Sequence, residues 1–387
     1  MKRNVYIMYA MALLQGMVFY GSIATLYRQA QGITVFQITI IESLSLVLCL
    51  ALELPWGVLA DRIGYKATMI FCSLLFVGSK VVFMFAASFW AFLAERLMLS
   101  VVFAGYSGVD SSILYLSAEP GQSQKAFGIY SSLGTAGLIL STLIFSVFVK
   151  SDYRLAALLT VVSHAAAAML SLFIKEVKPE KEDRLSAATF FAMLKTTLKN
   201  RRLLMLLAAG ALIAEANQTI TVFLNQLQYV RCGLGDGQIG YIYIGVTIVG
   251  MFAGVSARLT KKLGAARFAA AMFIAAAAAC MLLGLTRSAW LSVAAVVVLR
   301  LSASLYAPLS SELQNRQVTS GNRATQLSIN ALMIDGVGIS TNLVFGKLSD
   351  IKLTSAFFAG GVFCLLGLAL FFAWFRGRPR SEAKSQS

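Results

Sequence analysis

Charged side chains lie inside several apolar runs of this 387-residue sequence, and these runs are long enough to cross a lipid bilayer. Glu215, Arg300 and Asp335 each fall near the middle of such a run. A charge at the centre of a bilayer costs at least about 2.5–3.5 kcal/mol, so these side chains should face the protein interior or a water-filled cavity. There a carboxylate can take up and release a proton, and a guanidinium can hold an anion or pair with a carboxylate.

The apolar run 89–115 carries a polar stripe. At 100° per residue, one face of a continuous helix holds all of its members, which are Arg96, Ser100, Phe103, Ser107 and Asp110. A stripe with a cation toward one end and a carboxylate toward the other is unsuited to lipid, so Asp110 becomes a further candidate for binding a proton. A purely structural ion pair is the alternative for Arg96, and equally for Glu215 and Arg300.

Polar side chains also accompany the other two acids on their helical faces. Gln226 shares the face of Glu215, and Asn342 shares the face of Asp335, so both are candidates for contact with a bound ligand. Lys80 lies near the end of its run, where a long side chain can reach the membrane interface.

Other kinds of chemistry are not indicated. His164 is the only histidine, and no nucleophile or orienting group accompanies it in its alanine-rich run. The five cysteines are scattered singly without metal-ligand spacing, and no phosphate-binding loop is visible. We therefore expect no enzymatic activity, no cofactor and no metal site.

The composition determines which elements must position these residues. The chain is 58% hydrophobic and only 13% charged, with a mean hydropathy of +0.76, whereas soluble proteins carry about 25% charged residues. The net charge of +16 comes from basic residues that lie mainly between the apolar runs. That placement is typical of membrane topology, so we expect a lipid bilayer as partner and no nucleic acid.

A membrane-spanning helix needs about 20 largely apolar residues. By this criterion the sequence predicts an all-α integral membrane protein with twelve transmembrane helices, at 5–27, 37–59, 66–87, 89–115, 125–149, 154–174, 203–229, 237–257, 266–286, 288–312, 323–346 and 354–375.

The longest polar interruption divides these runs into six and six. We expect an N-terminal bundle at 1–175, a cytoplasmic linker at 176–202 and a C-terminal bundle with a short basic tail at 203–387. Placing both termini and the linker in the cytoplasm puts most lysines and arginines on the cytoplasmic side, as the positive-inside rule requires. The predicted location is the inner or plasma membrane.

A glycine-rich and charged segment joins the second and third runs. It reads PWGVLADRIGYKAT from Pro55 to Thr68, and its spaced residues are Gly57, Asp61, Arg62, Gly64 and Lys66. We expect a tight turn here, because glycine tolerates unusual dihedrals and close backbone approach. The spacing resembles the signature loop between helices 2 and 3 of the major facilitator superfamily.

The two halves of the sequence also resemble one another. Gly254 and Gly264 flank a basic segment between the second and third runs of the second half, with Arg258 at the position that corresponds to Asp61. Members of the superfamily are built from two such pseudo-repeated six-helix bundles. The resemblance therefore extends over nearly the whole chain.

The resemblance implies a secondary transporter in which the bundles rock about a central cavity lined by helices 1, 4, 7 and 10. It places Glu215 and Arg300 opposite each other across that cavity, and it gives Asp61 a gating role on the cytoplasmic side. The remaining candidates for lining the cavity or contacting a substrate are Gln15, Phe19, Arg96, Ser107, Gln226 and Asn342.

Our first hypothesis is a monomeric, proton-coupled exporter of a small, partly apolar molecule. The run 125–149 holds glycines but lacks the proline that is common in the superfamily's drug/proton antiporters, which leaves the direction open. One alternative is a proton symporter or uniporter that imports a small organic anion through Arg96 and Arg300. A more distant alternative is a membrane sensor or scaffold without transport.

Overall fold

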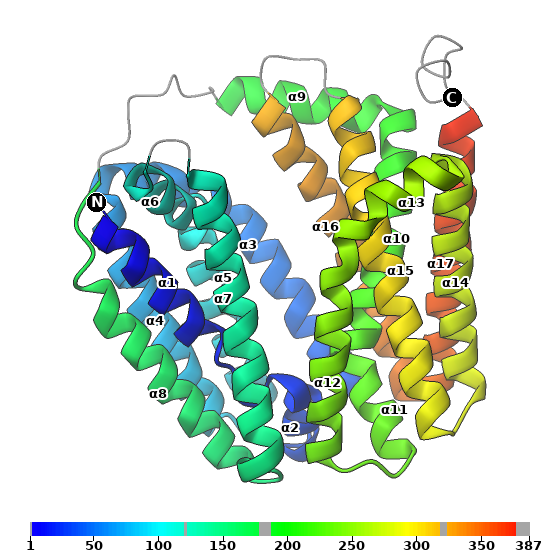
Figure 1. Cartoon of the computed structure of the whole chain (residues 1–387), viewed down its shortest axis with the longest axis horizontal. Helices are drawn as coiled ribbons and strands as arrows, with labels where there is room; N and C mark the ends of the chain where they lie inside the picture. Colours follow the sequence, from blue (N-terminus) through cyan, green and yellow to red (C-terminus); the bar gives the residue numbers. More distant parts are fainter. Residues whose placement is uncertain (1, 120–121, 178–186, 318–322, 377–387) are drawn as a thin grey trace. The chain divides into compact units, whose positions relative to one another are not determined.

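The computed structural model describes residues 2–119, 122–177, 187–317 and 323–376, and in these ranges only the backbone is described at 2, 53, 54, 57, 58, 61, 187–191 and 323–325. The described residues form helices and connecting turns, without strands (Figure 1). Twelve stretches among them are long and apolar enough to cross a membrane, and each overlaps one of the predicted runs. The prediction of an all-α, twelve-helix membrane protein is therefore confirmed.

Backbone contacts divide the chain into two compact units. The first comprises 1–183 and 235–244, and the second comprises 184–234 and 245–387. The first unit contains α1 (Lys2–Gly16), the 3₁₀ turn η1 (Gly21–Ile23), α2 (Ala24–Ala30), α3 (Val35–Ile63), α4 (Tyr65–Phe85), α5 (Phe89–Tyr106), α6 (Val109–Ser117), α7 (Ser123–Ile144), the π turn η2 (Phe145–Val149) and α8 (Tyr153–Ser171).

The second unit begins with the linker helix α9 (Ala187–Lys199). It continues with α10 (Arg201–Thr219), the π turn η3 (Ile220–Leu224), α11 (Asn225–Arg231), the 3₁₀ turn η4 (Met251–Val255), α13 (Ser256–Leu263), α14 (Ala265–Leu285), α15 (Ala289–Arg316), α16 (Arg323–Ile351) and α17 (Leu353–Arg376). α12 (Asp236–Gly250) is divided between the two units: its residues up to 244 belong to the first unit, and its residues from 245 belong to the second.

The signature segment is mostly helical. α3 continues through Pro55 and ends at Ile63, and α4 begins at Tyr65, so the reversal takes place at Gly64 alone. Gly64 has a φ of 92°, a conformation that side chains with a Cβ rarely adopt. The expected tight turn is therefore limited to Gly64, which has the unusual dihedral expected of a glycine here, and α3 extends beyond the predicted run 37–59. The predicted side-chain role of Asp61 lies outside the described side chains, and Gly57 lies within α3.

The fourth span is also not one continuous helix. α5 ends at Tyr106, Gly108 has a φ of 82°, and α6 begins at Val109. This break changes the helical phase, so the predicted single stripe from Arg96 to Asp110 does not form. Backbone propensity at one glycine overrides the periodicity of the flanking sequence.

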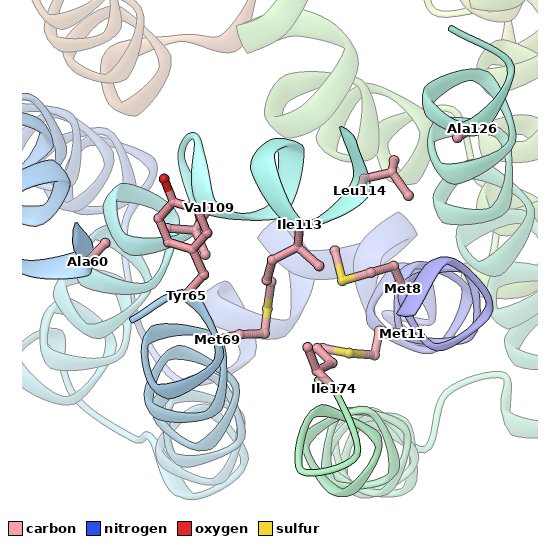
Figure 2. Packing of buried hydrophobic residues seen from close by; sticks show 10 residues of the cluster. All are labelled: Met8, Met11, Ala60, Tyr65, Met69, Val109, Ile113, Leu114, Ala126 and Ile174. Carbon is pink, nitrogen blue, oxygen red and sulfur yellow. The ribbon is translucent and has the colours of Figure 1, made fainter. Parts of the chain in front are cut away.

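Small residues bring α1 close to α7 in the first unit. A Cβ added to Gly137 would lie 2.1 Å from the carbonyl oxygen of Leu13, and one added to Gly16 would lie 2.2 Å from that of Gly134. Such contacts are typical of packed membrane helices. At one end of this unit, Met8 and Met11 of α1 gather with Met69 of α4 in a buried apolar cluster (Figure 2).

The second unit is held by aromatic packing around α15. The rings of Phe273 and Tyr306 lie 4.8 Å apart, and Phe371 of α17 lies 6.3 Å from both. Gly367 lets α17 approach α10, because a Cβ there would lie 3.2 Å from the carbonyl oxygen of Ala209. These contacts fix α10 and α15, which carry Glu215 and Arg300.

Candidate functional site

A cavity of about 410 Å³ lies between α10 and α15 in the second unit, with Ile334 of α16 at its edge. Its wall combines apolar side chains with charged and hydrogen-bonding ones. The polar members are Glu215, Asn217, Gln218, Arg300, Ser304, Tyr306, Ser310 and Ser311. A cavity of this kind can hold a small molecule that has both apolar and hydrogen-bonding parts.

Glu215 lies on α10 with its carboxylate against the backbone of α16. A Cβ added to Gly338 would lie 2.9 Å from Oε1 of Glu215, so the glycine makes room for the carboxylate. Among the described residues, the carboxylate has neither an ion pair nor a hydrogen bond. Asp335 lies on α16, as Gly338 does, and its charge acts on the Glu215 carboxylate from nearby. The structure thus brings two of the three predicted proton-binding candidates into one region.

Arg300 lies on α15 with its guanidinium against α12. A Cβ added to Gly250 would lie 2.7 Å from both Nε and Nη2 of Arg300. Nε is buried and has no hydrogen-bond partner among the described residues. Glu215 and Arg300 line the same cavity, but within the described part of the chain no ion pair joins them.

Two other predicted ligand contacts are packed away from the cavity wall. Asn342 is buried and accepts a hydrogen bond of 2.8 Å from the Thr219 hydroxyl. Gln226 is also buried, and its Nε2 donates to the carbonyl oxygen of Val222 at 2.8 Å. The π turn η3 lies between Glu215 and Gln226 and shifts the helical phase that the prediction assumed.

Several wall residues were missed, namely Asn217, Gln218, Tyr306 and Ser310. Asn217 and Gln218 follow Glu215 closely and could have been found as its polar neighbours. Tyr306 and Ser310 lie beyond Arg300 on α15, on either side of Pro308, which lies inside this helix.

The polar candidates of the first unit join different helices. Nε2 of Gln15 on α1 donates to the hydroxyl of Tyr106 on α5 at 3.0 Å, and that hydroxyl lies 2.8 Å from the Ser73 hydroxyl on α4. The backbone N–H of the buried Phe19 donates to the hydroxyl of Thr160 at 3.0 Å. These contacts connect α1 and the segment that follows it to α4, α5 and α8.

The break at Gly108 separates two further candidates from Arg96. Ser107 is the exposed C-cap of α5. Asp110 lies in the first turn of α6, where it accepts hydrogen bonds from the backbone N–H of Ser111 at 2.6 Å and from the hydroxyl of Tyr130 on α7. Asp110 therefore already has hydrogen-bond donors.

Arg96 belongs to a chain of alternating charges that we call the charge chain. Arg96 pairs with Glu42 of α3, and Glu42 lies 3.8 Å from Arg28 of α2. Arg28 lies 3.9 Å from Glu95 of α5, which in turn lies 3.6 Å from Lys80 of α4. The prediction that Lys80 reaches the membrane interface is wrong, because this side chain is 6% exposed and paired.

The signature segment is held by a residue that the sequence did not single out. Glu176 follows α8 and accepts hydrogen bonds from the backbone N–H of Tyr65 at 2.9 Å and of Lys66 at 3.2 Å. It therefore caps the N-terminus of α4, where a carboxylate is favoured by the helix dipole. A Cβ added to Gly64 would lie 2.9 Å from Oε2 of Glu176, so this cap also requires the glycine. Arg62 is exposed in the last turn of α3.

The comparisons with known proteins agree with this architecture. A family model described as Major Facilitator Superfamily matches residues 5–342. No curated protein matches the chain.

Among solved structures, a variant of the nucleoside transporter NupG is similar, with a TM-score of 0.80 at 16% identity, covering 96% of this chain and 99% of that one. A bacterial homologue of the human lysosomal transporter Spinster has a TM-score of 0.77 at 16% identity, covering 97% of each chain. The POT family transporter PepTSo has a TM-score of 0.74 at 13% identity, covering 97% of this chain and 98% of that one. At these identities the likeness concerns the fold.

Proposed function

Because this chain belongs to the Major Facilitator Superfamily, we propose that it is a proton-coupled secondary transporter that exports a small, partly apolar molecule. Its ligand binds in the cavity between α10 and α15. The whole chain acts as a monomer in the inner or plasma membrane, with both termini in the cytoplasm. This orientation is tested in a variant without the native cysteines: an impermeant thiol reagent should label a cysteine at position 151 but not one at position 182 in intact cells.

Glu215 is the observation that carries the proposal. Its carboxylate lies in the cavity, and neither an ion pair nor a hydrogen bond engages it among the described residues. A carboxylate in this position can hold a proton or the donor groups of a ligand. The proton and the ligand compete for the Glu215 carboxylate, so they cross the membrane in opposite directions. An inward proton gradient therefore drives the ligand outward.

Proton binding must also change the balance between two conformations. A ligand or proton shifts such an equilibrium only as far as it binds one state more tightly than the other. Near Glu215, the charge of Asp335 supplies a repulsion that one proton relieves. The favoured ligand is therefore neutral or cationic, with donors for Glu215 and for the amides and hydroxyls of the wall.

A second candidate function is the import of a small organic anion. Arg300 favours it, because its Nε is buried without a hydrogen-bond partner in the described part of the chain. A carboxylate ligand on Arg300 would satisfy this donor with a charge-assisted hydrogen bond. Such an anion would travel together with protons.

The test is reconstitution of the full chain in vesicles that contain a pH-sensitive dye. The panel holds neutral, cationic and anionic solutes, and it includes nucleosides because the similar NupG is a nucleoside transporter. We expect a neutral or cationic solute to move protons in the opposite direction. Glu215→Gln should abolish this coupled movement and retain solute exchange without a gradient.

Asp335→Asn is the comparison variant. If Glu215→Gln still drives uphill transport and Asp335→Asn does not, the proton site lies on α16. If only anions move protons, in the same direction, and Arg300→Gln stops this movement, the import function replaces the first.

A further inference from the structure

The cavity between α10 and α15 is lined by two opposite charges, those of Glu215 and Arg300. Within the described part of the chain, neither side chain makes an ion pair or a hydrogen bond. The nearby charge of Asp335 repels Glu215 and so does not compensate it. Charges removed from water are normally paired, so the cavity offers one position to a cationic group and another to an anionic group.

The two charges lie at different depths of this cavity. A Cβ added to Gly210 of α10 would lie 2.8 Å from Oγ of Ser310 on α15, so these two positions are level with each other. Two other spans separate α10 from α15 in the chain, so these helices cross the membrane in opposite directions (Figure 1). Glu215 follows Gly210 by five residues. Arg300 precedes Ser310 by ten residues toward the same side of the membrane, which at about 1.5 Å per residue displaces it from Glu215 by about 7.5 Å.

Apolar side chains make up much of the remaining wall. They are Ile213 and Ala214 on α10, Ala303 and Ala307 on α15, and Ile334 on α16. A volume of about 410 Å³ is within the range of pockets that enclose a small molecule. The wall therefore favours an apolar substituent beside the two charged positions.

We propose that the ligand of this cavity is a small zwitterion with an apolar side chain, of the type of an apolar α-amino acid. Its ammonium group donates hydrogen bonds to Glu215, and its carboxylate accepts hydrogen bonds from Arg300. Its side chain lies against the apolar wall. A purely cationic ligand would leave Arg300 without a partner, and a purely anionic ligand would leave Glu215 without one, whereas a zwitterion satisfies both.

The length of an α-amino acid agrees with the displacement of the two charges. Its N–Cα and Cα–C bonds of about 1.5 Å place the ammonium nitrogen about 2.5 Å from the carboxylate carbon. Charge-assisted hydrogen bonds of about 2.8 Å at both ends extend this length to about 8 Å, close to the displacement of about 7.5 Å between Glu215 and Arg300. The inference rests on the proposed function, because it takes the same cavity as the transport site, but it holds for either direction of transport.

The experiment compares three matched probes. L-leucine carries both charges, L-leucinamide lacks the carboxylate, and 4-methylpentanoate lacks the ammonium group. A ligand that binds only the folded state raises the melting temperature by mass action, so the affinity of each probe for the purified full chain in detergent is read from this rise. Each truncated probe leaves one charge of the cavity without a partner, and we expect it to bind roughly 100-fold more weakly than leucine. L-phenylalanine, its amide and 3-phenylpropanoate form a second series.

Two variants assign each end of the ligand to its residue. Arg300→Gln should remove the preference for the carboxylate, so that leucine and leucinamide bind with similar affinity. Glu215→Gln should instead make the affinities of leucine and 4-methylpentanoate similar. Arg316→Gln is the matched control, because Arg316 also lies on α15 but is 49% exposed and pairs with Glu312. It should keep both preferences of the wild type. Each readout is a ratio of two affinities for the same protein, so a general loss of stability does not imitate it.

The wild type alone can overturn the proposal. It fails if a truncated probe binds as tightly as its parent amino acid, or if neither leucine nor phenylalanine binds. The proposed function survives that failure if another solute of the vesicle panel moves protons and this movement depends on Glu215. Conversely, selective binding of the amino acids without any movement of protons would support the zwitterion site and overturn the proton coupling.

Discussion

The first and second units both contain charged side chains inside their membrane spans, but the charge chain of the first unit and the pair Glu215 and Arg300 of the second unit differ in their contacts. In the charge chain, each carboxylate contacts two cations, and the contacts connect α2, α3, α4 and α5. In the second unit, Glu215 and Arg300 line the same cavity without an ion pair between them, as far as the described residues extend.

This difference separates two uses of the same residue types. Buried charges that satisfy each other hold helices together, and removing one member leaves its partner uncompensated. Buried charges without partners do little for the fold, yet they are available to a proton or a ligand. Partner contacts, rather than depth or residue type, therefore distinguish the charges that hold helices together from those that we propose to bind a proton or a ligand.

Removal of a carboxylate should have the largest effect in the first unit. Glu95→Gln leaves Arg28 and Lys80 without their shared carboxylate, and breaking a buried ion pair costs about 3–5 kcal/mol. We expect the folded yield to fall severely, as measured by size-exclusion chromatography after heating.

The matched variant in the second unit is Glu215→Gln. It removes no ion pair of the described residues, so its folded yield should equal that of the wild type even though coupled transport is lost. A well-folded Glu95→Gln would show that the charge chain contributes little to stability and would remove the distinction between the two units.

The next largest difference between the two units should appear in double-mutant cycles. Residues in contact show coupling energies of about 0.5–3 kcal/mol, and separated residues add within about 0.3–0.5 kcal/mol. We expect coupling in this range between Glu42 and Arg96, and additivity between Glu215 and Arg300, when thermal stability is measured for each set of four proteins. Coupling of equal size in both cycles would mean that Glu215 and Arg300 form an ion pair in another conformation.

The architecture could be predicted from the sequence because the bilayer imposes a length and a composition on every span. The same reasoning identified the embedded charges and the glycine at position 64, since both are unusual in a helical, apolar setting. It could not identify which charges meet. Lys80 and Glu95 lie on different helices, and their contact depends on how α4 and α5 pack.

Errors in the candidate site have a local physical cause. The reasoning assumed 100° per residue through each span, but Gly108 interrupts the fourth span and η3 interrupts the seventh. Each interruption changes which side chains share a face, which is why Asp110 is separated from Arg96 and Gln226 is packed away from the cavity. Glu176 was missed because the donors of its hydrogen bonds are backbone N–H groups of a distant segment, and side-chain patterns carry no sign of them.

The smallest change tests whether the position of Glu215 matters apart from its charge. Gly338→Ala places a methyl group 2.9 Å from Oε1 of Glu215, so the flexible carboxylate must shift while it stays charged and inside the cavity. Gly336→Ala is the matched control, because a Cβ at Gly336 meets no atom within 4 Å. Both variants replace glycine by alanine within α16 and should alter stability by no more than about 1 kcal/mol.

The two variants should differ in transport rate. Since displacement of a reacting group by 1 Å can lower a rate about 100-fold, we expect the smaller shift in Gly338→Ala to lower the rate of proton-coupled transport about tenfold. Gly336→Ala should transport at the wild-type rate in the same vesicle assay. Equal rates for the two variants would mean that the carboxylate works equally well in more than one position, and that α16 does not fix the geometry of the proton site.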